Sequence, residues 1–451
     1  MESGHPHPNP LPLGEGVSGA SAHHSSPFGD SAASSPFGDS AASSPNTRPP
    51  LRLLHLADLH LGTETYGRVD SATGLSTRLA DFCRCLDEVV EYALSQDIDL
   101  VVFAGDAYRS RDPSPTHQRE LAQRIRRLAE RGLPVLLVAG NHDTPASPGR
   151  ASSVDIFETL SVPGVHVARQ AQTLLVETRR GPVQVVAVPW PQRSALLSRE
   201  EHKNRTAEEI NALLVERVND FIAQEEARLD PSLPAVLVAH LSVAGAALGS
   251  EVKFRFGQDF VVPLSAVARP AFAYVALGHL HRHQILHHAS PPVVYAGSLE
   301  RVDFGEEHEA KGFVVAELGP GQTRYQFVPV GAREFLTLEV SAGEDPTADV
   351  LAAVAGAEIE GKIVRLIVRM EPQYEARLCY PEVRRALRRA GYFAGLVKQV
   401  QREARLSTPF PHPEEVSPLE MLEFYLKARE VPAERAGTLL EYAKALLEGA
   451  R

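Results

Sequence analysis

Cysteine and long apolar runs are both scarce in this chain. Cysteine occurs only at Cys83, Cys85 and Cys379, which form no CxxC pair and no even set for a disulfide framework. This usage is typical of a reducing compartment, so we expect a cytoplasmic protein with buried or half-buried thiols. No apolar run approaches the roughly 20 residues that a membrane helix needs, so we expect no membrane contact.

An ATP-binding loop and a positive net charge are also missing. The chain has no GxxxxGK[ST] sequence, so any dependence on ATP would have to come from another subunit. It has 57 acidic and 46 basic residues, a formal net charge of −11. Nucleic-acid binders usually present a basic face, but a metal ion or a local basic patch can supply the same attraction. The acidic total therefore does not exclude a nucleic-acid substrate.

The first 50 residues differ in composition from the rest of the chain. Gly, Pro and Ser account for 26 of them, and the nonapeptide SSPFGDSAA occurs twice in tandem, at 25–33 and 34–42. Such a composition buries too little apolar surface to offset the entropy of ordering, and it lacks the apolar core of a signal peptide. We predict a disordered tail over 1–50, and the sequence leaves open whether this tail belongs to the native protein.

From residue 51 onward, apolar runs alternate with amphipathic helical patterns. The runs are LRLLHLA (51–57), DLVVFAG (99–105), PVLLVAG (134–140), PVQVVAVP (182–189), PAVLVAH (234–240), FAYVALG (272–278) and PVVYAG (292–297). Helical patterns near 75–95 and at 115–131 lie between the first of them. This alternation indicates an α/β domain over 51–332, with a buried sheet covered by helices on both faces and closed by strands at 311–318 and 323–330.

Two smaller units are expected after this domain. The first, over 333–405, is a small α/β cap domain with FLTLEVS and GKIVRLIVRM as strands and VRRALRRAGYF as a basic helix. The second, over 406–451, is a proline-rich linker followed by two short helices. Ser417 and Glu420 fit a capping box, with Pro418 at the first helical position. The helical hairpin either packs on the body or serves a partner, and its pattern does not decide between the two.

Five of the strand-like runs end in Asp, His or Asn. The candidate metal ligands at these ends are Asp58, His60, Asp106, Asn141, His240, His279 and His281. Each alone has an ordinary explanation as a turn, a cap or a buried histidine. Because one sheet would bring all five ends to one edge, a metal site is the better interpretation. Asp58 and His60, like His279 and His281, stand at i and i+2, so extended backbone would direct each pair to one side.

Seven ligands are too many for one ion and suit two ions that share a carboxylate. Mixed imidazole, carboxylate and amide ligands favour Mn, Fe or Zn over Mg and Ca, which prefer oxygen. Two divalent ions would bring four positive charges, whereas Asp58 and Asp106 supply two negative charges. The excess positive charge would attract a phosphate and lower the pKa of a bound water. The residue types therefore predict two-metal phosphoester chemistry.

These motifs resemble the five ordered motifs of the calcineurin-like metallophosphoesterases. They are Asp58-x-His60, Gly105-Asp106, Gly140-Asn141-His142-Asp143, His240 and Gly278-His279-Leu280-His281. The resemblance implies a β-sandwich flanked by helices. It assigns Asp58, His60 and His281 to one metal and Asn141, His240 and His279 to the other, with Asp106 bridging. It also implies that His142 faces the scissile phosphate and assists the leaving oxygen, and we expect Asp143 to orient His142 from behind.

The flanking segments resemble one branch of that superfamily, the SbcD-type DNA repair exonucleases. The similar segments are HLADLHLG (55–62), GDAYRSRDPSP (105–115), VAGNHDTPAS (138–147) and YAGSLERVDFGEEHEAKGF (295–313). The resemblance implies a manganese-dependent 3′-to-5′ exonuclease on double-stranded DNA ends and endonuclease on single strands. It also implies a homodimer whose terminal helices grip an SbcC-type ATPase. The chain departs from the family at Tyr108-Arg109, where Phe-Asp is frequent.

Two other interpretations of the same residues stay open. A phosphomonoesterase or cyclic phosphodiesterase acting on small molecules would use the same metals, because the fold does not name the substrate. A DNA-end scaffold without catalysis would use them only for structure. The complete ligand set and the presence of His142 favour an enzyme.

Residues outside the ligand set are candidates for substrate contact. Eight basic residues stand against two acidic ones between 377 and 405, which is either a solvated helix face or a surface for DNA phosphates. Trp190 is expected to pack in the core, although a tryptophan there could line a substrate site. The DNA-binding candidates are Arg384, Arg385, Arg388, Arg389, Ser298 and Arg301.

Overall fold

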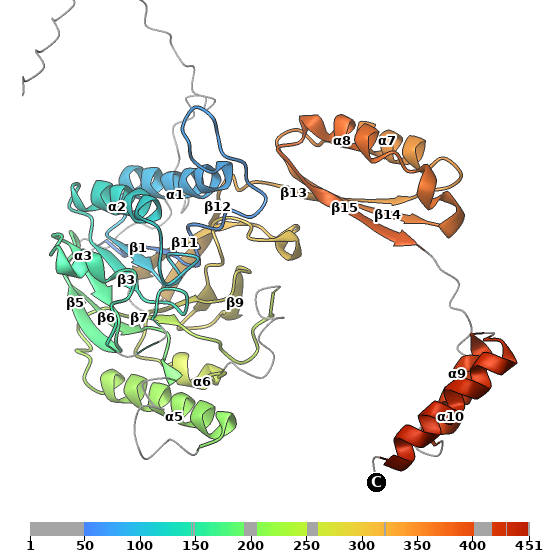
Figure 1. Cartoon of the computed structure of the whole chain (residues 1–451). Helices are drawn as coiled ribbons and strands as arrows, with labels where there is room; N and C mark the ends of the chain where they lie inside the picture. The colour runs from blue at the N-terminus through green and yellow to red at the C-terminus, as the bar shows by residue number, and fades with distance from the viewer. Residues whose placement is uncertain are drawn as a thin grey trace, which may run out of the picture. The chain divides into compact units, whose positions relative to one another are not determined.

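The computed structural model describes residues 49–145, 147, 149–193, 205–249, 260–319, 322–400, 417–429 and 431–449. Residues 1–48 and 401–416 lie outside this part, so the disordered tail and the proline-rich linker stay predictions. The described part contains two six-stranded sheets, a three-stranded sheet and a helical hairpin (Figure 1). No described helix is both long and apolar enough to span a membrane.

The first sheet has the strand order β12-β11-β1-β2-β3-β4. Its strands are β1 (Leu51–Leu56), β2 (Leu100–Phe103), β3 (Val135–Val138), β4 (Val165–Ala168), β11 (Gly312–Gly319) and β12 (Gln322–Pro329). Strands β1 to β4 are parallel, and β11 and β12 add an antiparallel pair beside β1. The expectation that strands near 311–330 close this domain is therefore confirmed.

The second sheet has the order β5-β6-β7-β8-β10-β9. Its strands are β5 (Gln172–Val176), β6 (Val183–Val188), β7 (Ala235–His240), β8 (Tyr274–Gly278), β9 (Gln284–His287) and β10 (Val293–Tyr295). The four inner strands are parallel, and β5 and β9 are antiparallel edges. The inner strands are buried on both faces, as continuous Val/Ala/Leu runs predict.

The two sheets pack face to face through one apolar core. Leu53 and Val102 of the first sheet share this core with Val185, Val236 and Ala276 of the second. The strand-like runs thus belong to two sheets, and the expectation of a single sheet is wrong. The pattern of apolar residues cannot distinguish one sheet from two. A strand with helices on both faces and a strand between a helix and a second sheet are both apolar on both faces.

Helices cover the outer faces of the sandwich. The helices α1 (Thr77–Ser95) and α2 (Pro115–Ala129) lie over the first sheet, and α5 (Ala207–Glu226) and α6 (Leu264–Val267) over the second (Figure 1). The apolar stripe of α5, which includes Leu214 and Ile222, packs on Leu237 of β7. A short helix, α3 (Asp155–Thr159), precedes β4, and a 3-10 turn occupies Phe304–Glu306. The predicted sandwich flanked by helices is confirmed.

The three-stranded sheet is parallel and has its own core. It contains β13 (Phe335–Ser341), β14 (Ile363–Met370) and β15 (Tyr392–Val400), joined by α7 (Pro346–Ala355) and α8 (Tyr380–Ala386) with 3-10 turns at Pro372–Arg377 and Leu387–Arg389. The predicted helix through VRRALRRAGYF is wrong at its end, because Tyr392 and Phe393 pair with β14 instead. Gly391 ends the helical stretch, and strand pairing overrides the local propensity. The domain boundaries stay predictions.

The C-terminal hairpin consists of α9 (Pro418–Ala428) and α10 (Ala433–Gly449). Ser417 accepts a hydrogen bond from the Glu420 amide, and the Glu420 carboxylate accepts one from the Ser417 amide. This reciprocal pair is the capping box that the sequence predicts, with Pro418 at the first helical position. Several apolar side chains of the hairpin are exposed: Met421, Tyr425, Leu439, Tyr442, Leu446 and Leu447.

The close approach of the two sheets at the end of β8 gives a test of the fold. A Cβ at Gly278 would lie 2.0 Å from the carbonyl oxygen of Ala104, which follows β2. Because a backbone atom cannot turn aside as a side chain can, we expect Gly278→Ala to lower the free energy of unfolding by about 3 kcal/mol. Urea denaturation measures it. In Gly343→Ala the new Cβ would have its nearest neighbour at 3.8 Å, so its stability should stay within about 0.5 kcal/mol of the parent. Equal stability of the two variants would contradict this packing.

Candidate metal centre

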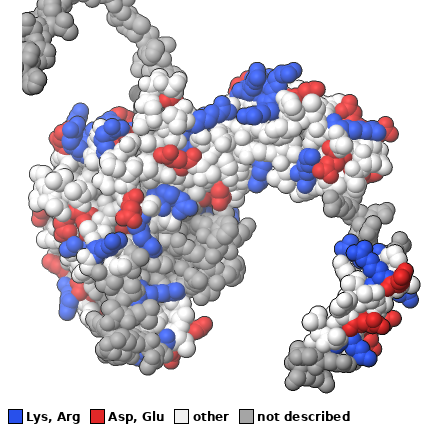
Figure 2. All heavy atoms as spheres, viewed as in Figure 1, with Lys and Arg blue, Asp and Glu red and all other residues white. Residues whose placement is uncertain are grey.

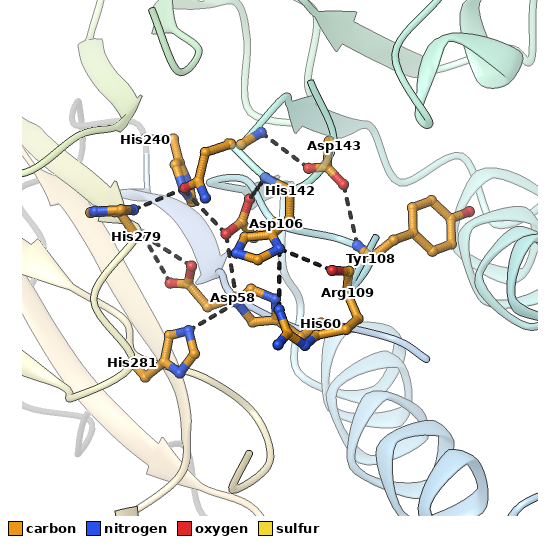
Figure 3. A network of polar contacts seen from close by, with 12 residues as sticks. Asp58, His60, Asp106, Tyr108, Arg109, His142, Asp143, His240, His279 and His281 are labelled. Carbon is orange, nitrogen blue, oxygen red and sulfur yellow. Dashed lines mark hydrogen bonds and ion pairs between the residues drawn. The ribbon is translucent and has the colours of Figure 1, made fainter. Parts of the chain in front are cut away.

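The loops at the carboxyl ends of five strands bring the seven candidate ligands together, and Figure 3 labels all of them except Asn141. The first sheet supplies Asp58 and His60 after β1, Asp106 after β2 and Asn141 after β3, and the second supplies His240 at the end of β7 and His279 and His281 after β8. All seven are at most 6% exposed. The expected meeting of strand ends therefore occurs, but across two sheets.

The backbone at several candidate ligands is in the left-handed region. The φ angles are 51° at Asp58, 48° at His60, 56° at Asp106 and 104° at His279. Such values are uncommon outside glycine and cost about 1 kcal/mol or more each, so they mark positions that the surroundings hold in place. The side chains of Asp58 and His60 converge through this turn. Our expectation that extended backbone aligns them is wrong.

The ligand atoms form two groups on either side of Asp106. Ligand atoms of Asp58, His60 and His281 lie within 4.8 Å of one another. On the other side, Asn141 Oδ1 lies 3.0 Å from both His240 Nε2 and His279 Nδ1. Asp106 Oδ2 is 3.5 Å from His60 Nε2 and 3.5 Å from His240 Nε2. One carboxylate oxygen is thus equally distant from an imidazole of each group.

The hydrogen bonds around the rings direct the Nε2 atoms of His240 and His281 into the centre. His240 Nδ1 lies 2.8 Å from the Ala104 carbonyl, which can only accept, so Nδ1 carries the proton. Burial lowers the pKa of His240, but Asp106 outweighs burial and raises it to about 9, so without an ion Nε2 is also protonated and donates to Asn141 Oδ1. In the same way His281 Nδ1 lies 2.6 Å from Glu306 Oε1, and His281 Nε2 faces His60 Nε2 at 2.9 Å. At both places a proton or a cation has to lie between the two facing atoms, so this donor set fits divalent ions that would take the place of the protons.

The buried charges point to the same conclusion. Burial raises the pKa of Asp58 to about 7, with Asp106 adding to the rise and His240 and His281 opposing it. Burial also raises the pKa of Asp106, but His240 and His60 outweigh it and hold that pKa well below its ordinary value. A carboxyl group that ionises only near neutrality beside an ionised one is a costly arrangement in a dry interior. Cations between the two carboxylates would stabilise it.

Comparison with known proteins agrees with this geometry. The family model described as "Calcineurin-like phosphoesterase" matches residues 51–283, which contain all seven candidate ligands and His142. The chain belongs to the calcineurin-like phosphoesterase family. Membership confirms the expected fold and the expectation of a metal-dependent phosphoesterase.

Several relatives of this phosphoesterase carry nuclease names. The D component of the SbcCD nuclease of Bacillus subtilis is 29% identical over 60% of this chain and 67% of its own length. The protein of the same name from Rhodobacter capsulatus is 29% identical over 67% of this chain and 75% of its own. "DNA double-strand break repair protein Mre11" of Aeropyrum pernix is 27% identical over 65% and 64%. The predicted resemblance to SbcD-type proteins is confirmed.

The catalytic candidates His142 and Asp143 lie beside the ligands. The His142 amide donates to Asp106 Oδ1 at 2.8 Å, and His142 Nδ1 lies 2.9 Å from the carbonyl oxygen of Arg109. The Asp143 carboxylate accepts hydrogen bonds from the amides of Gly140, Ala107 and Tyr108. None of these contacts reaches the His142 ring, so the expectation that Asp143 orients His142 from behind stays a prediction. Asp143 fastens the loops after β2 and β3 together, and a backbone carbonyl holds the ring.

Two buried residues that the sequence analysis did not select support His281. Glu306, 1% exposed, binds His281 through one carboxylate oxygen and Lys311 through the other at 2.8 Å. Lys311 Nζ also donates to the Ser298 hydroxyl and to the His281 carbonyl. Both residues lie in the segment GEEHEAKGF, whose charges look like those of a surface loop. The one sequence signal for their burial is that Lys311 follows Glu306 by five residues, so that the two opposite charges could pair.

The predictions that Ser298 and Arg301 contact DNA are wrong. Ser298 is fully buried against Lys311, so it cannot reach a nucleic acid. The Arg301 guanidinium is half-buried and donates to the carbonyls of Glu307, Glu309 and Arg333. Both side chains hold the protein's own loop together.

The four remaining DNA-binding candidates are exposed. Arg384 and Arg385 belong to α8, and Arg388 and Arg389 to the 3-10 turn after it. Figure 2 shows basic side chains gathered over this segment. Arg389 makes two hydrogen bonds to the Glu360 carboxylate, which lowers its availability to a phosphate. The other three have no ion-pair partner within the described residues, and their contact with DNA stays a prediction.

Trp190 makes metal binding measurable. It is the chain's one tryptophan, and its ring centroid lies 4.6 Å from that of His279. We expect Mn²⁺, added to metal-free protein, to quench its fluorescence. In Asp106→Ala the affinity should fall more than about 100-fold, because the loss of a ligand exceeds the 10–100-fold typical of outer contacts. Asp97→Asn, an exposed carboxylate, should titrate like the parent, and equal titration of Asp106→Ala would contradict this centre.

Glu306 provides a second test. Glu306→Gln keeps the shape but removes the charge that fixes the His281 proton on Nδ1. We expect Mn²⁺ affinity to fall about 10–100-fold, with recovery of activity at high metal concentration. Glu309→Gln is the matched control, since Glu309 also binds Lys311 Nζ at 2.8 Å but contacts no candidate ligand in the described contacts. A similar loss in both variants would assign the effect to Lys311 alone.

Proposed function

We propose that this chain is a two-metal-dependent DNA nuclease that acts in DNA repair. The observation that carries the proposal is the position of Asp106, equally distant from His60 and His240, with a buried ligand group on each side. The nuclease names of the relatives support DNA as the substrate. The substrate, the polarity and the metal are parts of this proposal.

The ligand set divides into two sites in this proposal. Asp58, His60 and His281 would hold one ion, and Asn141, His240 and His279 the other, with Asp106 shared and manganese favoured by the mixed ligands. Bound ions would supply positive charge to the phosphate and lower the pKa of a coordinated water. The chain's own residues fix the imidazole tautomers through Ala104 and Glu306, so no ring has to turn when an ion enters.

His142 is the proposed acid for the leaving oxygen. Its Nδ1 proton is directed to the Arg109 carbonyl, which leaves Nε2 as the nitrogen that could give a proton to substrate. A ligand atom of His142 lies within 4.8 Å of those of His60 and Asp106, close enough to reach a phosphate that bound ions would attract to this centre. Asp143 acts at a distance in this scheme, because it joins the loops that carry Asp106 and His142.

DNA would be held by residues outside the centre. We propose residues 333–405 as a capping domain, with Arg384, Arg385, Arg388 and, less strongly, Arg389 on DNA phosphates. Contacts of this kind are independent of sequence and weaken steeply with salt. We further propose 3′-to-5′ exonuclease action on double-stranded ends and endonuclease action on single strands.

The C-terminal hairpin would bind a partner protein. Its apolar side chains, among them Tyr425, Tyr442 and Leu446, are exposed at 53%, 69% and 74%. Apolar side chains at helical spacing suit a groove on another protein. We propose an SbcC-type ATPase as that protein, since the chain has no ATP-binding loop of its own, and a homodimer of this chain in the complex.

The test is cleavage of a duplex labelled at its 3′ or 5′ end, with Mn²⁺ present. We expect early loss of the 3′ label. Asp106→Ala should show no cleavage, and His142→Ala should lower kcat at least about 100-fold with little change in Mn²⁺ affinity, because an acid contributes 10²–10⁴-fold.

Two further measurements complete this test. Arg228→Ala, an exposed arginine paired with Glu225, should cleave at the parent rate. A bis-nitrophenyl phosphate and a nucleotide run in parallel. An intact duplex with rapid turnover of these small esters would move the assignment to a small-molecule phosphoesterase.

A further inference from the structure

A cavity of about 730 Å³ lies directly beside the candidate metal centre. Its walls come from the loop after β3, the turn between β4 and β5, the end of β6 and one side of α5. Thr144, two residues after His142, lines it, and so does Trp190, whose ring contacts His279. The volume is that of pockets that bind small organic ligands, roughly 300–1,000 Å³.

The lining combines an apolar surface with arginines. Val188, Leu214 and Phe221 line the cavity together with Trp190. Three arginines line it as well: Arg150, Arg169 and Arg217. Arg169 is paired with Asp155 at 3.3 Å, whereas Arg150 and Arg217 have no ion-pair partner within the part of the chain that the structure describes. A flat aromatic ring, an apolar wall and two unpaired cations suit a ligand that joins a planar ring to a phosphate.

We propose that this cavity receives one or two unpaired nucleotides of the substrate strand, with a base stacked on Trp190 and phosphates paired with Arg150 and Arg217. The inference rests on the proposed nuclease function and adds where the strand next to the cleaved bond lies. Bases stack on aromatic side chains with little regard to sequence, and arginines bind the backbone. A paired base cannot enter, because its neighbours in the duplex already cover its faces.

The position of the cavity gives this proposal a consequence for double-stranded ends. The loop that carries His142 continues directly into the cavity wall through Thr144, whose hydroxyl donates to the Gly140 carbonyl. A strand crossing the centre therefore meets the cavity within the next nucleotides. A blunt end would have to open by one or two base pairs before its terminal strand occupies the site.

The experiment uses the fluorescence of Trp190 in the full chain. Pentathymidylate is titrated in the presence of a chelator, which prevents cleavage. We expect quenching that saturates, and at least tenfold weaker binding by the Arg150→Ala, Arg217→Ala double variant. Arg228→Ala, an arginine beyond the end of α5 that does not line the cavity, is the matched control and should bind like the parent. Trp190→Phe removes the signal, and its binding is followed by anisotropy of a dye-labelled oligonucleotide.

Three results would overturn the proposal. They are equal quenching by a blunt duplex, displacement of pentathymidylate by inorganic phosphate at the same concentration, and unchanged binding by the double variant. Duplex cleavage is measured separately. Cleavage of DNA without pentathymidylate binding would contradict the proposed role of the cavity and support the nuclease function. Pentathymidylate binding without cleavage of any DNA would contradict the nuclease function on which the inference rests.

Discussion

The burial of three carboxylates among imidazole rings is the constraint on which the rest of this structure depends. Asp58, Asp106 and Asp143 are at most 2% exposed, and each is stabilised differently. The Asp143 carboxylate accepts hydrogen bonds from three backbone amides, and the Asp58 carboxylate accepts one from the His279 amide. Asp106 lies beside the two histidines His60 and His240. These hydrogen bonds require the backbone to lie close to the carboxylates. The neighbouring glycines therefore have no room for a side chain. A Cβ at Gly140 would lie 2.1 Å from Asp106 Oδ1, and one at Gly105 would lie 2.2 Å from His240 Nδ1.

The centre also explains why the sandwich has its topology. In each sheet the strands that carry ligands are parallel neighbours, so their carboxyl ends meet at one edge. The two edges then face each other, and Asn141 of the first sheet contacts His240 and His279 of the second. Neither sheet holds a complete ligand group alone. A bound ion would therefore link the two halves of the molecule, and its loss would weaken the contact between them.

Much of this arrangement could be predicted, because single residues at strand ends carry chemistry that turns do not need. The seven candidate ligands, the flanking helices and the Ser417 capping box follow from local sequence. What sequence could not give depends on tertiary contacts. Asp58 and His60 converge through left-handed backbone, Tyr392 leaves a helical pattern to pair with β14, and Ser298 is buried by a lysine thirteen residues later. Glu306 and Lys311 look like solvent-exposed charges until the loop folds over His281.

The orientation of the His142 ring and the charge beside it depend on different parts of Arg109, although these two properties usually change together. The ring is held by a main-chain carbonyl, which every amino acid possesses, so the orientation of the ring does not depend on the side chain at position 109. The guanidinium there lies 3.4 Å from the same ring. The charge next to the proposed proton donor is thus adjustable by a single substitution that leaves the ring where it is. An arginine in place of the aspartate frequent in the family reverses that charge without rebuilding the site.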